Sequence, residues 1–152
     1  MSGKKPAKGR PESAPTPVLK QGSYVFRDGS TYNGEYAEVK STTDPGTVIQ
    51  RHGTGTFENK ETGLLYIGGW EADKMSGTGS MRYSDKSSYE GSWKDGLFQG
   101  AGCYTYPDGS KYDGDFDKGL PQGPGKVIDA NGQKWAGSFN GGKGLGLVPE
   151  IA

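Results

Sequence analysis

A five-residue phrase recurs through this chain at a fixed interval: an aromatic residue, any residue, glycine, any residue, and a second aromatic residue. It starts at residues 32, 66, 89, 112 and 135, so the last four copies are 23 residues apart and the first interval is 34. A fixed period of this size is typical of repeat proteins, in which each unit packs mainly against its neighbours. Each copy is followed by a Gly-x-Gly pair, at Gly53/Gly55, Gly77/Gly79, Gly100/Gly102, Gly123/Gly125 and Gly144/Gly146.

The spacing within each unit predicts β-hairpins. In Tyr89-Glu90-Gly91-Ser92-Trp93 the two aromatic residues and the glycine alternate with other residues, which places them on one face of a strand. Asp108-Gly109 and its counterparts in other units are the strongest short-range signal of a hairpin turn. One hairpin cannot bury its apolar face alone, so the expected fold is all-β: stacked hairpins in a single-layer, elongated, twisted and curved sheet, with strands of about five to six residues.

Three parts are expected along the chain. Residues 1–19 are rich in Pro and basic residues and are expected to form a disordered tail. The repeat array is expected over 20–146, with a half-hairpin at 20–31 and repeats starting near 32, 66, 89, 112 and 135, and residues 147–152 form the C-terminal end. About ten extra residues in the first unit, near 37–50, contain Asp44-Pro45-Gly46, which predicts a turn.

Glycine stands at the centre of each aromatic phrase. A glycine inside a strand costs stability unless something needs the space that a side chain would fill. We therefore expect aromatic rings to lie over these glycines, and replacement of Gly91 or Gly114 by Val to produce a clash with a ring. The structural glycines predicted in this way are Gly34, Gly68, Gly91, Gly114 and Gly137.

Few residues could carry out chemistry. His52 is the only histidine, placed in a polar loop, and the sequence offers no Cys/His cluster for a metal, so neither a cofactor nor an enzymatic activity is expected. The net charge is zero, which argues against a nucleic-acid partner. The alternating Asp113, Asp115 and Asp117 are expected on a solvated strand face. The single Cys103 and the lack of a long apolar run or secretory signal predict a soluble intracellular protein.

The seventeen aromatic residues have two interpretations. They could simply hold one hairpin to the next, or part of their surface could line a groove for a partner's apolar side chains, since Trp and Tyr are frequent in interface hot spots. We expect both, with the core role dominant. Leu97 and Phe98, assigned to a loop, and the equivalent Leu120 and Met75 would add apolar rims. The candidate groove residues are Tyr66, Trp70, Tyr89, Trp93, Tyr112, Phe116 and Trp135.

The unit from Tyr89 to Tyr112, YEGSWKDGLFQGAGCYTYPDGSKY, resembles the MORN repeat (membrane occupation and recognition nexus). That repeat has about this length, a Tyr-Glu-Gly-x-Trp opening, a Gly-x-Gly middle and an Asp-Gly turn. The resemblance extends over roughly residues 20–146. It departs from the pattern in the first unit, which has Tyr36 for Trp and an insert, in the second, which lacks an Asp-Gly turn, and in the short fifth unit, which opens with Trp135.

The resemblance implies a curved, groove-bearing rod of β-hairpins that acts as a scaffold or adaptor. MORN arrays occur in cilia, flagella, cytoskeletal collars and membrane-associated complexes, and some bind an extended or helical segment of a partner such as a myosin tail. We therefore expect a non-catalytic adaptor in a cytoskeletal, ciliary, flagellar or axonemal assembly of the cytoplasm, with self-association through the sheet ends as a further possibility.

A membrane-associated module is the alternative. In that case a basic tail would bind anionic lipid while the array holds a protein partner nearby. A solvated tail without a specific role is the simpler interpretation of the same residues. The tail residues concerned are Lys4, Lys5, Lys8 and Arg10.

Overall fold

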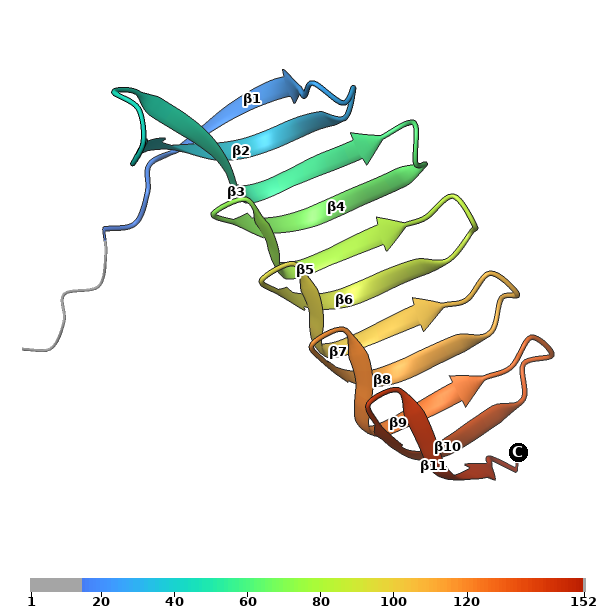
Figure 1. Cartoon of the computed structure of the whole chain (residues 1–152). Helices are drawn as coiled ribbons and strands as arrows, with labels where there is room; N and C mark the ends of the chain where they lie inside the picture. Colours follow the sequence, from blue (N-terminus) through green and yellow to red (C-terminus); the bar gives the residue numbers. More distant parts are fainter. Residues whose placement is uncertain (1–14, 152) are drawn as a thin grey trace, which may run out of the picture.

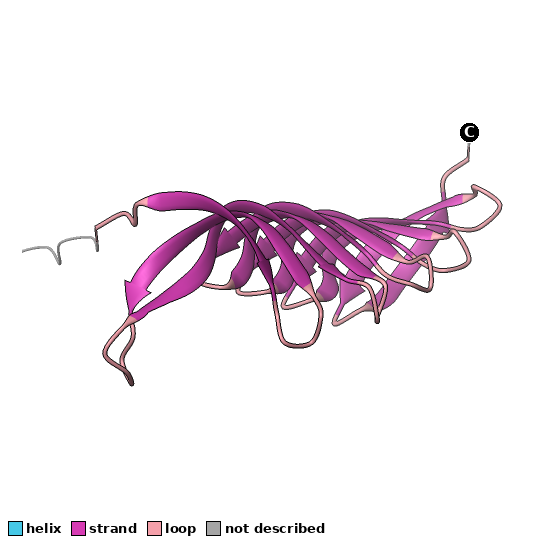
Figure 2. Ribbon diagram, turned by 90° about the horizontal axis from the view of Figure 1, so that it is seen from above, coloured by secondary structure: helices cyan, strands magenta, loops and turns pink. Residues whose placement is uncertain are grey.

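The computed structural model describes residues 15–151, and over that range the chain forms one open sheet of eleven antiparallel strands and no helix (Figure 1). Each strand pairs with the next one in the chain, which confirms the predicted all-β, single-layer fold. Seen from above, the sheet twists along its length (Figure 2). The strands are β1 (Leu19–Val25), β2 (Thr31–Lys40), β3 (Thr47–Asn59), β4 (Leu64–Glu71), β5 (Lys74–Arg82), β6 (Ser88–Lys94), β7 (Leu97–Thr105), β8 (Lys111–Asp117), β9 (Leu120–Ile128), β10 (Lys134–Asn140) and β11 (Lys143–Pro149).

A row of glycines crosses the sheet and sets its register. The central glycines Gly68, Gly91 and Gly114 each lie directly opposite the second glycine of a Gly-x-Gly pair on both neighbouring strands. One glycine from each strand from β1 to β10 therefore joins a continuous row: Gly22, Gly34, Gly55, Gly68, Gly79, Gly91, Gly102, Gly114, Gly125 and Gly137.

The first glycine has a different role in the pairs at 53/55, 77/79, 100/102 and 123/125. Gly77 and Gly100 have φ values of 76° and 77°, in the left-handed region that glycine adopts without a steric penalty. The register shifts at the same level, between Gly68 and Trp70 and between Gly91 and Trp93, so each hairpin carries a bulge there. The strands continue through the bulge, which is why they have 7 to 13 residues instead of the predicted five to six.

Eight aromatic rings form a continuous ladder on one face of the sheet, which we call the inner face. Tyr66, Tyr89 and Tyr112 each pack edge-to-face against the closing ring of their own phrase and that of the next one, with centroids 4.7 to 5.2 Å apart. Tyr32 packs in the same way against Trp70, the closing ring of the next phrase, at 5.6 Å. Aromatic pairs in this geometry contribute about 0.5–1.5 kcal/mol each beyond the apolar area that they bury. In order, the aromatic ladder consists of Tyr32, Trp70, Tyr66, Trp93, Tyr89, Phe116, Tyr112 and Phe139.

The polar atoms of the aromatic ladder bind the backbone at the glycine row. The Tyr89 hydroxyl donates to the Ser92 carbonyl at 2.8 Å, and the Tyr66 hydroxyl donates to the Gly69 carbonyl at 2.9 Å. The Trp93 indole Nε1–H donates to the Gly79 carbonyl at 3.1 Å. In the part of the chain that the structure describes, every buried side-chain nitrogen or oxygen has a partner, so the ladder buries its polar atoms without an unpaired group.

Two kinds of turn alternate along the chain. Along one side of the sheet, where strand ends are joined, two-residue turns such as Asp95-Gly96 have positive φ at both positions. This is the conformation of type I′ turns, which match the twist of the flanking strands. Along the opposite side, the loops are longer and an aspartate stabilises them. The carboxylate of Asp85 accepts hydrogen bonds from the hydroxyl and the N–H of Ser87, at 2.5 and 2.9 Å. These hydrogen bonds, the hydroxyl's first, hold the pKa of Asp85 below its usual value.

The insert in the first unit lengthens a hairpin. Residues 36–40 of β2 continue to pair with residues 47–51 of β3 beyond the bulge, and the N–H of Ser41 donates to the Gly46 carbonyl to close the loop. The sequence Asp44-Pro45-Gly46 lies in this loop. Arg51 pairs with Tyr36 at the end of this extension that lies nearest the bulge, and there it contacts Asp73 of the second unit.

The glycine row predicts a strong position-dependent effect of adding one methyl group. A Cβ on Gly91 would lie 2.5 Å from the Gly102 Cα and 2.7 Å from the Tyr89 hydroxyl, so Gly91→Ala should lower the free energy of unfolding by about 3 kcal/mol or more. A Cβ on Gly46 would have no atom within 4 Å, so Gly46→Ala should change the free energy of unfolding by less than about 0.5 kcal/mol. Urea denaturation of both variants provides the measurement, and equal stabilities would contradict the packing of rings against the glycine row.

The buried tyrosines predict unfolding in alkali. Burial raises the pKa of Tyr32, Tyr66 and Tyr89 to about 12, above the value of about 10 for an unfolded chain. A raised folded-state pKa gives stability that is complete below pH 10 and is lost as the pH rises from about 10 through about 12. Phenolate absorbance and circular dichroism should therefore change together in that window. Ionisation of these tyrosines near pH 10 with the sheet intact would be the contrary result.

Candidate functional site

An open hollow of about 330 Å³ lies on the inner face between β3, β4 and β5. Tyr66, Trp70 and Met81 line it and are buried in the aromatic core. Half-buried apolar side chains complete its lining, and charged residues stand at its rim. The half-buried residues are Phe57, Leu64 and Met75, and the charged ones are Arg51, Asp73 and Lys74.

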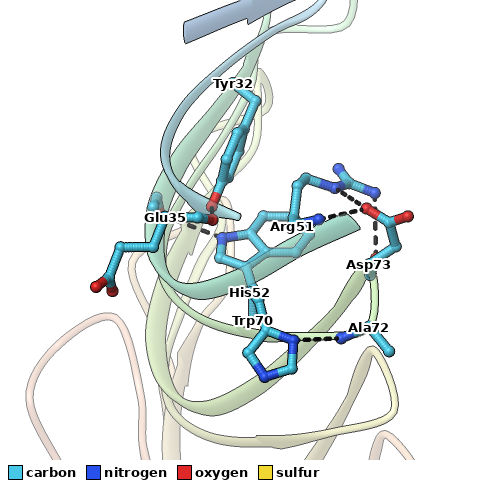
Figure 3. Close-up of polar contacts among 8 residues, drawn as sticks. Tyr32, Glu35, Arg51, His52, Trp70, Ala72 and Asp73 are labelled. Atoms are coloured by element: carbon cyan, nitrogen blue, oxygen red, sulfur yellow. Dashed lines mark hydrogen bonds and ion pairs between the residues drawn. The ribbon is translucent and has the colours of Figure 1, made fainter. Parts of the chain in front are cut away.

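Arg51 lies at the rim of this hollow, and Figure 3 shows its contacts with Asp73. Its guanidinium carbon lies 4.3 Å from the centroid of the Trp70 ring, 5.4 Å from Phe57 and 5.7 Å from Phe26, which are cation–π distances. Its Nε–H donates to the Asp73 carboxylate at 3.0 Å, and an Nη2–H donates to the Asp73 carbonyl at 3.1 Å. The guanidinium is therefore held in one place by rings and by an ion pair.

The Arg51–Asp73 pair exists because both residues depart from the repeat pattern. The residue two positions before each Gly-x-Gly pair is apolar in the next three units, Met75, Phe98 and Pro121, and it is arginine in the first. The second residue of the adjacent turn is glycine in three units and Asp73 in the second, with φ at 69°. The N–H of Asp73 still donates to the Arg51 carbonyl at 3.0 Å, as the turn glycines do to Met75 and Phe98.

A second hollow, of about 390 Å³, lies on the other side of Arg51. Phe26 and Phe57 provide its apolar surface, and Arg27, Asp28 and Arg51 its charged groups. Phe57 and Arg51 line both hollows, so the two form one surface interrupted by a guanidinium.

The groove residues predicted from the sequence are mostly buried in the core, and only Tyr66 and Trp70 of them line the first hollow. Tyr66, Tyr89 and Tyr112 are at most 1% exposed, and Trp70, Trp93 and Phe116 are 4–6% exposed. Trp135, half-buried, lies opposite Val127 and Pro149 near the last strand. All of them except Trp135 belong to the buried core cluster, and contact of any of them with a partner stays a prediction.

The residues that line the accessible surface, Arg51, Phe57 and Leu64, were absent from the predicted set, while Met75 was predicted only as a rim. The sequence does contain a feature that identifies Arg51. It occupies the position two residues before Gly-x-Gly, where later units have the apolar residues Met75 and Phe98. The prediction that Leu97 and Phe98 lie in a loop is wrong, because both belong to β7. A two-residue turn ends just before them, so the strand begins earlier than the pattern suggested.

The remaining polar candidates have structural surroundings. His52 lies in β3, half-buried, and its Nδ1 accepts the N–H of Ala72 at 3.3 Å, so its assignment to a loop is wrong (Figure 3). The row Asp113, Asp115 and Asp117 is exposed on β8, on the face opposite the aromatic ladder. The candidate tail residues Lys4, Lys5, Lys8 and Arg10 lie outside the described residues. Between residues 15 and 151 there is no helix with the length and apolarity needed to cross a membrane.

Two replacements of Asp73 separate the contribution of the ion pair to stability from that of the backbone conformation. Asp73→Ala and Asp73→Gly both remove the carboxylate, but only glycine adopts a φ of 69° without a penalty of about 1 kcal/mol. The Gly variant should therefore be more stable to urea than the Ala variant by about that amount. Equal stabilities would show that the turn does not retain this conformation in solution.

The repeat geometry agrees with a comparison to known protein families. The family model for the MORN repeat matches residues 66–88, 89–111 and 112–134, in phase with the units at Tyr66, Tyr89 and Tyr112. No curated protein matches the chain. MORN repeats are generally non-enzymatic modules that bind proteins or membranes. The chain therefore contains three consecutive MORN repeats, over residues 66–134.

Proposed function

We propose that this protein is a non-catalytic adaptor whose inner face binds an extended or helical segment of a partner protein. The observation that carries the proposal is the hollow lined by Phe57, Leu64, Trp70 and Met75, because it offers apolar surface in a concave site with charged groups only at its rim. Sites that bind peptides or small ligands commonly have this composition.

The repeat supplies further apolar surface along the same face. Phe98, Tyr104 and Val127 are half-buried against the aromatic ladder in later units, at positions related to Met75 and Phe57 by the repeat. The rigid ladder beneath them fixes their spacing, so a bound segment would meet a preformed surface and lose less free energy to ordering of the protein. This arrangement suits a linear segment that crosses several repeats.

Membership in a cytoskeletal, ciliary or flagellar assembly is the cellular setting that we propose, by analogy with other MORN proteins. It assigns the adaptor a partner from a filament, motor or axonemal complex. The array would then serve as a rigid rod that holds this segment within the assembly.

A charge placed in the hollow should abolish partner binding. Met75→Glu introduces a carboxylate at a half-buried apolar position, and proteins captured from source cells by the full chain should be lost from this variant. Ile67→Glu is the matched control, since Ile67 is 54% exposed on the opposite face and its replacement should leave capture unchanged.

Thermal melts of both variants, followed by circular dichroism, ensure that loss of binding is not loss of folding. Capture retained by folded Met75→Glu, or lost only with Ile67→Glu, would place the interaction away from the inner face and refute the proposal.

A further inference from the structure

We propose that the bound segment carries a large apolar side chain close to a carboxylate, with the apolar group in the hollow of Leu64 and Met75 and the carboxylate on Arg51. This inference rests on the proposed function and adds the chemistry of the partner. It follows from Arg51, a cation at a position where the next three units have Met75, Phe98 and Pro121.

Arg51 has hydrogen-bonding capacity that Asp73 does not use. A guanidinium carries five N–H donors, and the contacts with Asp73 engage its Nε–H and one Nη2–H. The Arg51 side chain is still 23% exposed, and it borders the hollows on both sides. Donors of the same guanidinium are therefore accessible to an acceptor on a bound segment.

The charges around the two hollows favour an acidic partner. The cations are Arg27, Arg51 and Lys74, and the anions are Asp28 and Asp73. Asp28 accepts the N–H and hydroxyl of Ser30, and Asp73 is paired with Arg51. These acids are thus engaged within the protein.

Lys74 is only weakly neutralised by a neighbouring acid. Its Nζ lies 4.0 Å from the Asp95 carboxylate, and the two side chains are 62% and 69% exposed, so this pair contributes little. An approaching segment therefore meets an apolar surface with an excess of positive charge, to which a carboxylate is complementary.

Stacking prepares Arg51 for this role. Contact with the Trp70 ring at 4.3 Å and with two phenylalanine rings fixes the plane of the guanidinium before a ligand arrives. A fixed planar fork binds a carboxylate with a smaller loss of side-chain entropy than a free lysine does. Because the equivalent residues in later units are Met75, Phe98 and Pro121, only the first unit would recognise charge, and the position of the acid would set the register of the segment along the array.

A random peptide library displayed on phage, selected on the full chain, tests the proposal. Peptides that bind should be enriched in Leu, Met, Phe or Trp with an Asp or Glu nearby. Selection of basic peptides, or of apolar peptides without an acid, would overturn the proposal. Self-association of the chain that Met75→Glu abolishes would also overturn it, because the hollow would then hold a second copy.

A double-mutant cycle identifies the residue that recognises the acid. For a selected peptide, Glu→Gln in the peptide should weaken binding to the wild-type chain about fivefold and binding to Arg51→Met hardly at all. Methionine is the residue at the equivalent position of the next unit. Arg82→Met, a change of the same kind at an exposed site on the opposite face, should retain the full preference. Equal losses in wild type and Arg51→Met would overturn the assignment.

The two proposals fail in different ways. Binding that Met75→Glu abolishes, but that neither Arg51→Met nor the peptide's Glu→Gln affects, leaves the proposed function intact and overturns only this inference. If Arg51→Met does not fold, the Nε–Hε signal of Arg51 in the wild-type chain gives the answer by NMR. It should shift on addition of the acidic peptide and not with the Gln peptide, and the absence of a shift would overturn the inference.

Discussion

The packing of tyrosine rings against a row of glycines is the interaction on which this structure depends. Tyr66 and Tyr89 bind the backbone of their own strands through their hydroxyls, and each touches the closing aromatic rings of two successive phrases. A single-layer sheet has no second layer to cover its apolar face, and these rings cover that face instead. In the first four Gly-x-Gly pairs, the second glycine makes room for a tyrosine ring, while the first has a positive φ at the bulge of the strand.

Much of the fold follows from sequence because it depends on local spacing that repeats. The period, the strand alternation and the Asp-Gly turns each predict hairpins, and their agreement leaves one architecture. Strand lengths were harder to predict from the sequence, because Gly77 and Gly100 bend the chain without ending the strand. Nothing in the pattern marks Leu97 as a strand residue, because the preceding Asp95-Gly96 turn is only two residues long.

The candidate site was only partly predictable, because a repeat pattern shows which residues recur and not how deeply each is covered. Trp93 and Tyr112 fit both a core and an interface role in sequence, and the ladder encloses both. The accessible surface comes from positions where the residue type varies between units, such as that of Met75, Phe98 and Pro121. Arg51 depends on the long first hairpin and on Asp73 in the next unit, a contact between residues 22 apart that no local rule describes. Departures from the repeat, more than the repeat itself, therefore mark the site.

Hydrogen exchange of the three tryptophan indole N–H groups tests the central claim most directly. Trp70 and Trp93 donate to the Gly55 and Gly79 carbonyls and are 5–6% exposed, whereas Trp135 is only half-buried near the last strand. The indole protons of Trp70 and Trp93 should exchange as slowly as the central strand amides, and that of Trp135 much faster. Fast exchange of all three would contradict a closed aromatic ladder and, with it, the rigid surface proposed to bind a partner.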